Sequence, residues 1–280
     1  MTRLDTGSRA ERAAMLRETA REIRLLILDM IHTANSGHPG GSLSAADIMT
    51  ALHFDIMRTD PTRPRWPERD RVLLSKGHAC PVLYACLAKR GYFGLNELKT
   101  LRRFESILQG HPIHKTPGVD MTTGSLGHGL SIGVGMALEG RLAKRDSQVY
   151  VILGDGELNE GLVWEAAMAA SKFRLGNLVA IVDRNGLQMD GPCEEVMPMG
   201  DIGAKFQAFG WTTMEIDGHD MEQILEALET ARDHAEGPVC IVARTVKGKG
   251  VSYMENVCEW HGKCPDNEQF CCALDEIKGA

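Results

Sequence analysis

The sequence predicts an α/β fold in which helices flank both faces of one doubly wound, mainly parallel sheet. Short apolar runs rich in β-branched residues alternate with longer stretches that carry apolar residues at helical spacing. The 280 residues are enough to bury a substantial core, and they contain neither an internal repeat nor a low-complexity linker. We therefore expect a single domain over residues 1–280.

The amino-terminal half is expected to supply most of the helices. Residues 8–34 are amphipathic at helical spacing, and a second helix over 43–54 is expected to begin after a Gly-Gly-Ser break. The apolar run 71–74 predicts a short strand, after which residues 79–90 return to helical spacing. Glycines and prolines interrupt residues 91–125, which indicates ordered loops with short helical pieces.

The second half alternates between the two kinds of element. A helix is expected over 127–144, where glycines at positions 127, 129, 133 and 135 would let it approach neighbouring backbone closely. Apolar runs predict strands at 148–153, 178–183, 212–216 and 238–246. Helical spacing predicts helices at 158–172, 201–209 and 220–234.

Charge and hydropathy exclude several classes of function. The net charge is −7, and acidic and basic residues are interspersed, so no basic stripe indicates nucleic acid. No apolar run approaches the roughly 20 residues of a membrane span. The apolar cluster from Ile23 to Ile31 is interrupted by Arg24 and Asp29 and lacks the profile of a signal peptide. We therefore expect a cytoplasmic protein that binds neither nucleic acid nor membrane.

The eight cysteines leave one alternative open. Four lie in apolar or turn contexts and are expected to be reduced thiols in a cytosolic chain, namely Cys80, Cys86, Cys193 and Cys240. The other four cluster near the end of the chain around His261, namely Cys258, Cys264, Cys271 and Cys272. Zinc binding is possible there, but no paired C-x2-C spacing supports it, and ordinary thiols are favoured.

A glycine-rich turn carries the strongest functional signal. Asp155 follows the strand 148–153 within Gly-Asp-Gly, and Asn185 follows the strand 178–183. Two parallel strands joined by a helix would place both side chains at neighbouring carboxyl ends, where open α/β sheets hold ligands. Their oxygens suit a Mg²⁺ or Ca²⁺ ion that still needs outside oxygens, such as those of a diphosphate. The alternative is a tight strand–helix turn in an ordinary α/β domain.

The full motif is more specific. Gly-Asp-Gly-Glu-Leu-Asn-Glu-Gly at 154–161, followed by Asp-Arg-Asn-Gly-Leu at 183–187, resembles the cofactor motif of thiamine diphosphate enzymes. The resemblance implies that Asp155, Asn185 and the carbonyl of Leu187 bind Mg²⁺ or Ca²⁺. It also assigns Gly156 and Glu157 to the cofactor site, since a Cβ at Gly156 would obstruct the approach of backbone N–H groups to the phosphates.

Four histidines stand in glycine-flanked segments instead of on helix faces. They are His38 in Ser-Gly-His-Pro-Gly-Gly, His78 in Ser-Lys-Gly-His-Ala, His111 in Gly-His-Pro and His261 in His-Gly-Lys-Cys-Pro. Imidazoles titrate near neutrality and can donate or accept, so they suit contacts with an anion or a substrate oxygen. Any one of them alone would be interpreted as a surface-loop histidine.

These segments, together with 117–127, resemble transketolase along nearly the whole chain, in the order found in its N-terminal, diphosphate-binding (PP) domain. The resemblance implies that His78 and His261 contact the diphosphate or line its channel, and that His38 and His111 face a donor ketose. Gly124 and Leu126 would border the aminopyrimidine. Glu160 would lie at a subunit interface and link to the catalytic glutamate of the partner.

The chain also departs from the family. His128 stands where transketolases usually carry glutamine, and Pro-Gly-Gly-Ser-Leu-Ser follows His38 where Pro-Gly-Ala-Pro is commoner. Both departures concern the choice of substrate, which the sequence does not identify.

A full-length transketolase also has a pyrimidine-binding domain and a third domain, and we expect this chain to lack both. We therefore expect the N-terminal subunit of a split transketolase, catalytically incomplete by itself, in an α2β2 assembly with a C-terminal subunit that carries the pyrimidine-binding domain and the catalytic glutamate. The expected reaction transfers a two-carbon ketol unit from a ketose phosphate to an aldose phosphate.

Two alternatives remain at this point. The chain could serve another thiamine diphosphate enzyme, such as a deoxyxylulose phosphate synthase-like enzyme or the α chain of a 2-oxo acid dehydrogenase. It could also be a non-catalytic cofactor-binding remnant.

Overall fold

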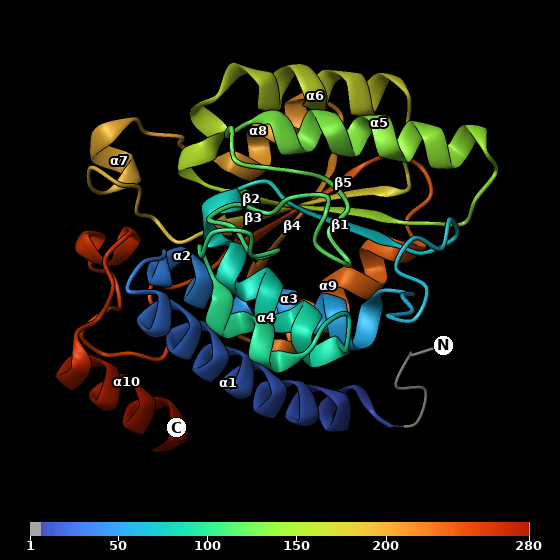
Figure 1. The fold of residues 1–280 in the computed structure, drawn as a ribbon. Helices are drawn as coiled ribbons and strands as arrows, with labels where there is room; N and C mark the ends of the chain where they lie inside the picture. Colours follow the sequence, from blue (N-terminus) through green and yellow to red (C-terminus); the bar gives the residue numbers. More distant parts are fainter. Residues whose placement is uncertain (1–6, 280) are drawn as a thin grey trace.

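A computed structural model describes residues 7–279, so the outermost positions of the predicted 1–280 domain lie outside the described residues. Its centre is a five-stranded sheet in the order β1-β2-β3-β5-β4, in which every strand pair is parallel (Figure 1). The expected α/β architecture is therefore confirmed. The strands are β1 (Arg71–Leu74), β2 (Val149–Gly154), β3 (Leu178–Arg184), β4 (Thr212–Asp217) and β5 (Val239–Arg244).

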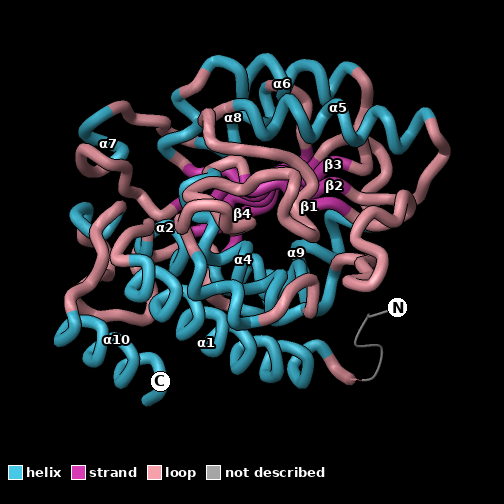
Figure 2. The backbone as a smooth tube through the Cα atoms, in the orientation of Figure 1, coloured by secondary structure: helices cyan, strands magenta, loops and turns pink. Residues whose placement is uncertain are grey.

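Helices cover both faces of the sheet. Figure 2 shows α5, α6 and α8 on one side of the strands, and α1, α4 and α9 on the other. None of the helices in the described part of the chain is long and apolar enough to cross a membrane. The α-helices are α1 (Arg9–Ala34), α2 (Pro39–Ser44), α3 (Ala46–Ala51), α4 (Cys80–Arg90), α5 (His128–Leu142), α6 (Gly161–Lys172), α7 (Cys193–Val196), α8 (Ile202–Ala208), α9 (Met221–Asp233) and α10 (Asn267–Gly279). Shorter helical segments are Leu52–Ile56, Gly77–Ala79, Leu95–Thr100, Gly156–Asn159 and Cys258–His261.

The strands divide the core into two layers by simple alternation. In β2, Tyr150 and Ile152 pack with the layer of α1, α3, α4 and α9, while Val151 and Leu153 pack with the layer of α5, α6 and α8. Successive side chains of a strand point to opposite faces, so a strand with helices on both sides is apolar throughout. This explains why the strands are recognisable in the sequence as uninterrupted apolar runs.

Two predicted helices illustrate where local sequence decides and where it does not. The helix expected over 8–34 is α1, whose first turn is closed by a capping box between Ser8 and Glu11. The helix expected over 43–54 is wrong in extent, because helix already begins at Pro39 and continues as α2, α3 and the π-helical segment Leu52–Ile56. The glycines interpreted as a break serve close packing: a Cβ on Gly40 would lie 2.8 Å from the carbonyl oxygen of Trp260.

The glycines of α5 mostly have the packing role predicted for them. A Cβ on Gly129 would lie 2.2 Å from Oγ of Ser75, and one on Gly133 would lie 2.6 Å from Cγ2 of Val151. Gly127 has φ +83°. For Gly135 the prediction is wrong, since a Cβ there would meet nothing within 4 Å.

Replacing His53 by leucine is expected to stabilise the chain by about 1–3 kcal/mol, because the imidazole is buried without compensation. His53 is 3% exposed in the π-helical segment, and neither of its ring nitrogens has a hydrogen-bond partner among the described residues. Burial, aided by the charge of Arg90, lowers the pKa of His53 to about 3. His53 is therefore protonated below about pH 6.5 in the unfolded chain but stays neutral in the folded chain until the pH approaches 3. Because the unfolded chain binds the extra proton, the free energy of unfolding falls as the pH drops from 6.5 towards 3.

Urea unfolding of the wild type and the leucine variant between pH 7 and pH 4 tests this prediction. The variant should be more stable, and the difference should widen as the pH falls. A His114→Gln control, at an exposed histidine whose Nδ1 lies 3.2 Å from Oγ1 of Thr122, should change the free energy of unfolding at pH 7 by less than about 0.5 kcal/mol. A destabilised His53→Leu protein would show that the imidazole is satisfied in solution.

Candidate active site

Asp155 and Asn185 lie at the adjacent carboxyl ends of β2 and β3, as predicted. The two strands pair in a register that sets Gly154, directly before Asp155, opposite Asp183, two residues before Asn185. Oδ1 of Asp155 accepts a hydrogen bond from the N–H of Gly156 at 2.9 Å, and Oδ2 accepts one from Gly186 at 2.6 Å. The carboxylate therefore joins the turn after β2 to the turn after β3.

The predicted metal ligands come together at this junction. Oδ1 of Asn185 accepts a hydrogen bond from the N–H of Leu187 at 3.2 Å, and Asp155, Asn185 and Leu187 line the same cavity. Burial raises the pKa of Asp155, the neighbouring Asp183 adds to the rise, and the N–H groups of Gly186 and Gly156 oppose it. A buried carboxylate whose charge is costly gains from a bound cation. Carboxylate, amide and carbonyl oxygens fit Mg²⁺ or Ca²⁺.

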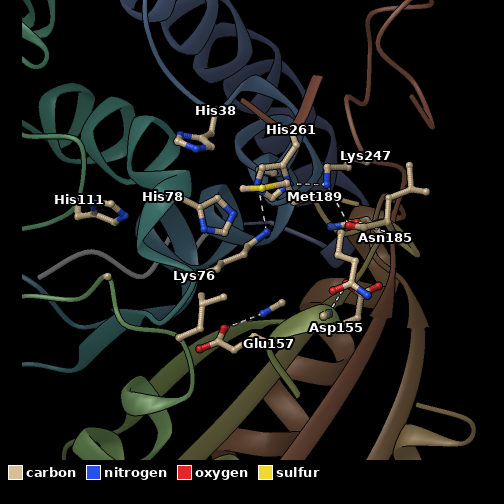
Figure 3. A pocket seen from close by; sticks show the side chains of 17 residues that line it. His38, Lys76, His78, His111, Asp155, Glu157, Asn185, Met189, Lys247 and His261 are labelled. Carbon is tan, nitrogen blue, oxygen red and sulfur yellow. Dashed lines mark hydrogen bonds between the residues drawn. The ribbon is translucent and has the colours of Figure 1, made fainter. Parts of the chain in front are cut away.

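A cavity of about 340 Å³ opens above these turns (Figure 3). It receives side chains from segments far apart in the sequence, and it brings together every predicted site residue except one. The predicted residues that line it are His38, His78, His111, Gly124, Leu126, Asp155, Gly156, Glu157, Asn185, Leu187 and His261.

Glu160 is the exception. It is an exposed residue at the N-cap position of α6, without a side-chain capping hydrogen bond, and it is not among the residues that line the cavity. A Cβ on Gly127 would lie 2.7 Å from the Cβ of Glu160, so the two turns touch at this point. An exposed position fits a residue expected to meet another subunit, and that role stays a prediction.

Glu157 has a structural environment within the cavity wall. Its carboxylate accepts hydrogen bonds from the hydroxyl of Ser75, from the N–H of Gly127 at 2.8 Å and from the N–H of Gly154 at 3.0 Å. Burial raises its pKa, while the hydroxyl and the two N–H groups lower it. This side chain ties the loop before α5 to the turn after β2, which are two walls of the cavity.

Three of the four predicted histidines form a cluster. The ring centroids of His38, His78 and His261 lie 5.0–5.6 Å apart. Burial, followed by nearby positive charge, lowers the pKa of His38 and of His261 to about 4 and that of His78 to about 2. His111 lies on the same cavity, and burial followed by Arg102 lowers its pKa. All four are therefore neutral at pH 7, and each offers one N–H donor and one acceptor nitrogen.

Two lysines that the sequence patterns did not single out complete the cavity. Lys247 donates hydrogen bonds to the carbonyl oxygen of Leu187 at 2.9 Å and to Nδ1 of His261 at 2.8 Å. Burial, followed by the charge of Lys76, lowers the pKa of Lys247 to about 8. Lys76 is buried, pairs with Asp183 and donates to the carbonyl of Gly41 at 3.0 Å. Each lysine follows a strand and precedes a glycine, a signal that could have identified both.

The cavity suits a doubly charged anion beside a metal ion. Two ammonium groups, the neutral histidines and the glycine turns surround it, and Nε2 of Gln188 is buried without a partner among the described residues. A Cβ on Gly156 would lie 3.1 Å from Cβ of Gln188, so glycine keeps this wall close to the cavity. The unpaired N–H group of Gln188, the two lysine ammonium groups and a metal site made only of oxygen atoms fit a metal-bound diphosphate.

The described residues give no support to the alternative of a zinc site among the cysteines near the end of the chain. All eight cysteines are free thiols, and residues 7–279 contain no group of three or more histidine, cysteine, aspartate or glutamate side chains placed to hold a metal ion.

Comparisons with known proteins agree with this geometry. Residues 15–273 match the family model "Transketolase, thiamine diphosphate binding domain". A subunit of the apulose-4-phosphate transketolase of Phocaeicola vulgatus is 44% identical over 91% of this chain and 90% of its own length. The 6-deoxy-6-sulfo-D-fructose transketolase subunit SqwG of a Clostridium species is 43% identical over 96% of this chain and 98% of its own length.

Single-chain transketolases are also similar, over part of their length. Human transketolase is 43% identical over 89% of this chain and 40% of its own. The crystal structure of the Campylobacter jejuni enzyme superposes with a TM-score of 0.90 at 34% identity, over 95% of this chain and 43% of that one. This chain therefore spans about two fifths of the single-chain enzymes. The relatives of matching length are named as transketolase subunits. This chain belongs to the transketolase family and corresponds to its thiamine diphosphate-binding domain.

Proposed function

We propose that this chain acts as the diphosphate-binding subunit of a two-subunit transketolase. With a separate subunit it would transfer a two-carbon ketol unit from a ketose donor to an aldose acceptor. The observation that carries the proposal is the single cavity in which Asp155, Asn185 and the carbonyl of Leu187 meet two lysines and a cluster of neutral histidines. Relatives of matching length are named as transketolase subunits, which supports the need for a partner.

The residues have distinct roles in this proposal. Asp155, Asn185 and the carbonyl of Leu187 would hold Mg²⁺, and Lys76 and Lys247 would bind the diphosphate. When bound, thiamine diphosphate supplies the electron sink for cleaving and forming carbon–carbon bonds next to a carbonyl. The histidines donate or accept hydrogen bonds at substrate oxygens: His38 and His111 for the donor ketose, His261 for both substrate and cofactor.

The assembly and the substrates follow from the same proposal. Glu160, exposed beside the cavity wall, would link to the catalytic glutamate of the partner chain, and an α2β2 assembly would complete two sites. Sugar phosphates are the proposed substrates. The relatives named for apulose 4-phosphate and 6-deoxy-6-sulfo-D-fructose point to ketoses with an anionic group. A cytoplasmic location remains a prediction.

The test is to purify the tagged chain from its native host and identify what accompanies it. We expect a stoichiometric partner that carries a pyrimidine-binding domain, with thiamine diphosphate released on denaturation. The complex should then convert ketose–aldose pairs, and the chain alone should not. Consumption of pyruvate without consumption of ketose would indicate another thiamine diphosphate enzyme. A chain that purifies alone and binds cofactor without turnover would indicate a binding remnant.

A further inference from the structure

A cation outside the cavity lining contacts one of the cavity histidines. Arg102 lies in the loop that follows the segment Leu95–Thr100, and its Nη2 is 3.4 Å from Nδ1 of His38. Its Nη1 donates a hydrogen bond to Oγ of Ser36 at 2.8 Å. One guanidinium group therefore contacts two residues of the Ser-Gly-His segment. In sequence, Arg102 lies 66 positions after Ser36 and 64 positions after His38.

The loop holds this guanidinium in place. Arg102 has φ +60°, a left-handed conformation that is uncommon for a residue with a side chain, and its N–H donates to the carbonyl of Leu108 at 2.8 Å. Gly110 leaves room for the group: a Cβ there would lie 3.0 Å from Nε of Arg102 and 3.2 Å from Cζ. The backbone, and not only the flexible side chain, therefore directs Arg102 towards His38.

The chemistry of arginine then decides the state of the histidine. A guanidinium has only donors and stays charged in proteins, so the nitrogen that faces it must be an acceptor. Burial, followed by the charge of Arg102, lowers the pKa of His38 to about 4, and the ring is neutral at pH 7. A neutral imidazole whose Nδ1 accepts carries its hydrogen on Nε2.

That hydrogen is available to a ligand. No residue in the described part of the chain hydrogen-bonds to Nε2 of His38, and the ring lines the cavity (Figure 3). The backbone of His38 is fixed as well, since its carbonyl accepts from Oγ of Ser42 at 2.7 Å.

We propose that Arg102 is a positioning residue that holds His38 in the Nε2–H tautomer, so that His38 presents a hydrogen-bond donor, not a base, to the substrate. The role of this Nε2–H group as a donor to a ketose oxygen rests on the proposed function. The assignment of the tautomer does not depend on that function. A donor at this position stabilises negative charge that develops on a substrate oxygen.

Nitrogen NMR of the full chain labelled with ¹⁵N-histidine tests the tautomer without any substrate. The His38 signals, identified by their loss in His38→Gln, should show an unprotonated Nδ1 and a protonated Nε2 at pH 7. In Arg102→Met, which keeps the apolar stem and removes the donors, the Nδ1–H form should become populated. Arg102→Lys keeps a donor and should retain the wild-type pattern. A protonated Nδ1 in the wild type, or an unchanged tautomer in a folded Arg102→Met protein, would overturn the proposal.

Activity of the assembled complex provides the second readout. Arg102→Met should lower kcat/KM for the ketose about tenfold, the size expected when one oriented hydrogen bond is lost, and Arg102→Lys should restore most of it. If the NMR result holds and no ketose is turned over by the wild type, the proposed function fails while the tautomer assignment stands. If the wild type is active and Arg102→Met changes neither readout, the positioning role fails alone.

Discussion

Replacement of Asp155 by alanine is expected to lower the metal-dependent affinity of the assembled complex for thiamine diphosphate by at least about 100-fold. Loss of an outer-shell partner of a metal ligand typically costs about 10–100-fold, and a direct ligand is worth at least as much. The change also removes the acceptor that joins the N–H groups of Gly156 and Gly186, so the two turns lose their common anchor. Calorimetric titration of the cofactor at fixed Mg²⁺ measures the effect.

Two variants of the same region make this result specific. Asp155→Asn keeps one acceptor oxygen but loses the charge, and its amide nitrogen cannot accept from the second of the two N–H groups, so its affinity should lie between alanine and wild type. Asp190→Ala removes an exposed carboxylate from the loop after β3, outside the cavity lining, and should bind as the wild type does. If the alanine variant of Asp155 is folded and still shows Mg²⁺-dependent binding of normal strength, the metal site has been assigned to the wrong residues.

Strand patterns and the Asp155–Asn185 spacing were enough to predict the sheet and the centre of the site. Strands covered on both faces are apolar throughout, so their positions are visible without any tertiary information. Parallel strands joined by a helix fix the relative position of their carboxyl ends, and that geometry brings Asp155 to the N–H of Gly186. The cofactor junction was therefore predictable because it follows from topology.

Features that depend on contacts between distant segments were not predictable in the same way. Pro39 at the start of α2 is a local signal for a helix, but the reason for the glycines that follow it is not local, because a Cβ on Gly40 would lie 2.8 Å from the carbonyl oxygen of Trp260. Helix α10 was not predicted, because its adjacent cysteines favour a thiol cluster over the amphipathic pattern that packs against α1. Arg102 is invisible in the sequence because its role arises only when the loop after Thr100 meets the Ser36–His38 segment.

Lys76→Met is expected to destabilise the chain by about 3–5 kcal/mol, because it leaves a buried carboxylate without its counter-ion. Lys76 is 2% exposed and Asp183 is fully buried. Burial alone would raise the pKa of Asp183, but Lys76 and the hydroxyls of Ser44 and Thr245 lower it below its usual range. Removal of the ammonium leaves only the two hydroxyls to satisfy the charge. Urea unfolding at pH 7 measures the loss.

The double variant Lys76→Met/Asp183→Asn separates the two functions of this lysine. It removes the charge together with its partner, so most of the lost stability should return, whereas cofactor affinity should stay low because Lys76 also lines the cavity. Lys249→Met, which breaks a partly exposed pair with Glu255, should cost less than about 1 kcal/mol. If Lys76→Met costs no more than Lys249→Met, Asp183 is not held as a buried anion. If the double variant regains cofactor binding along with stability, Lys76 supports the fold and does not contact the diphosphate.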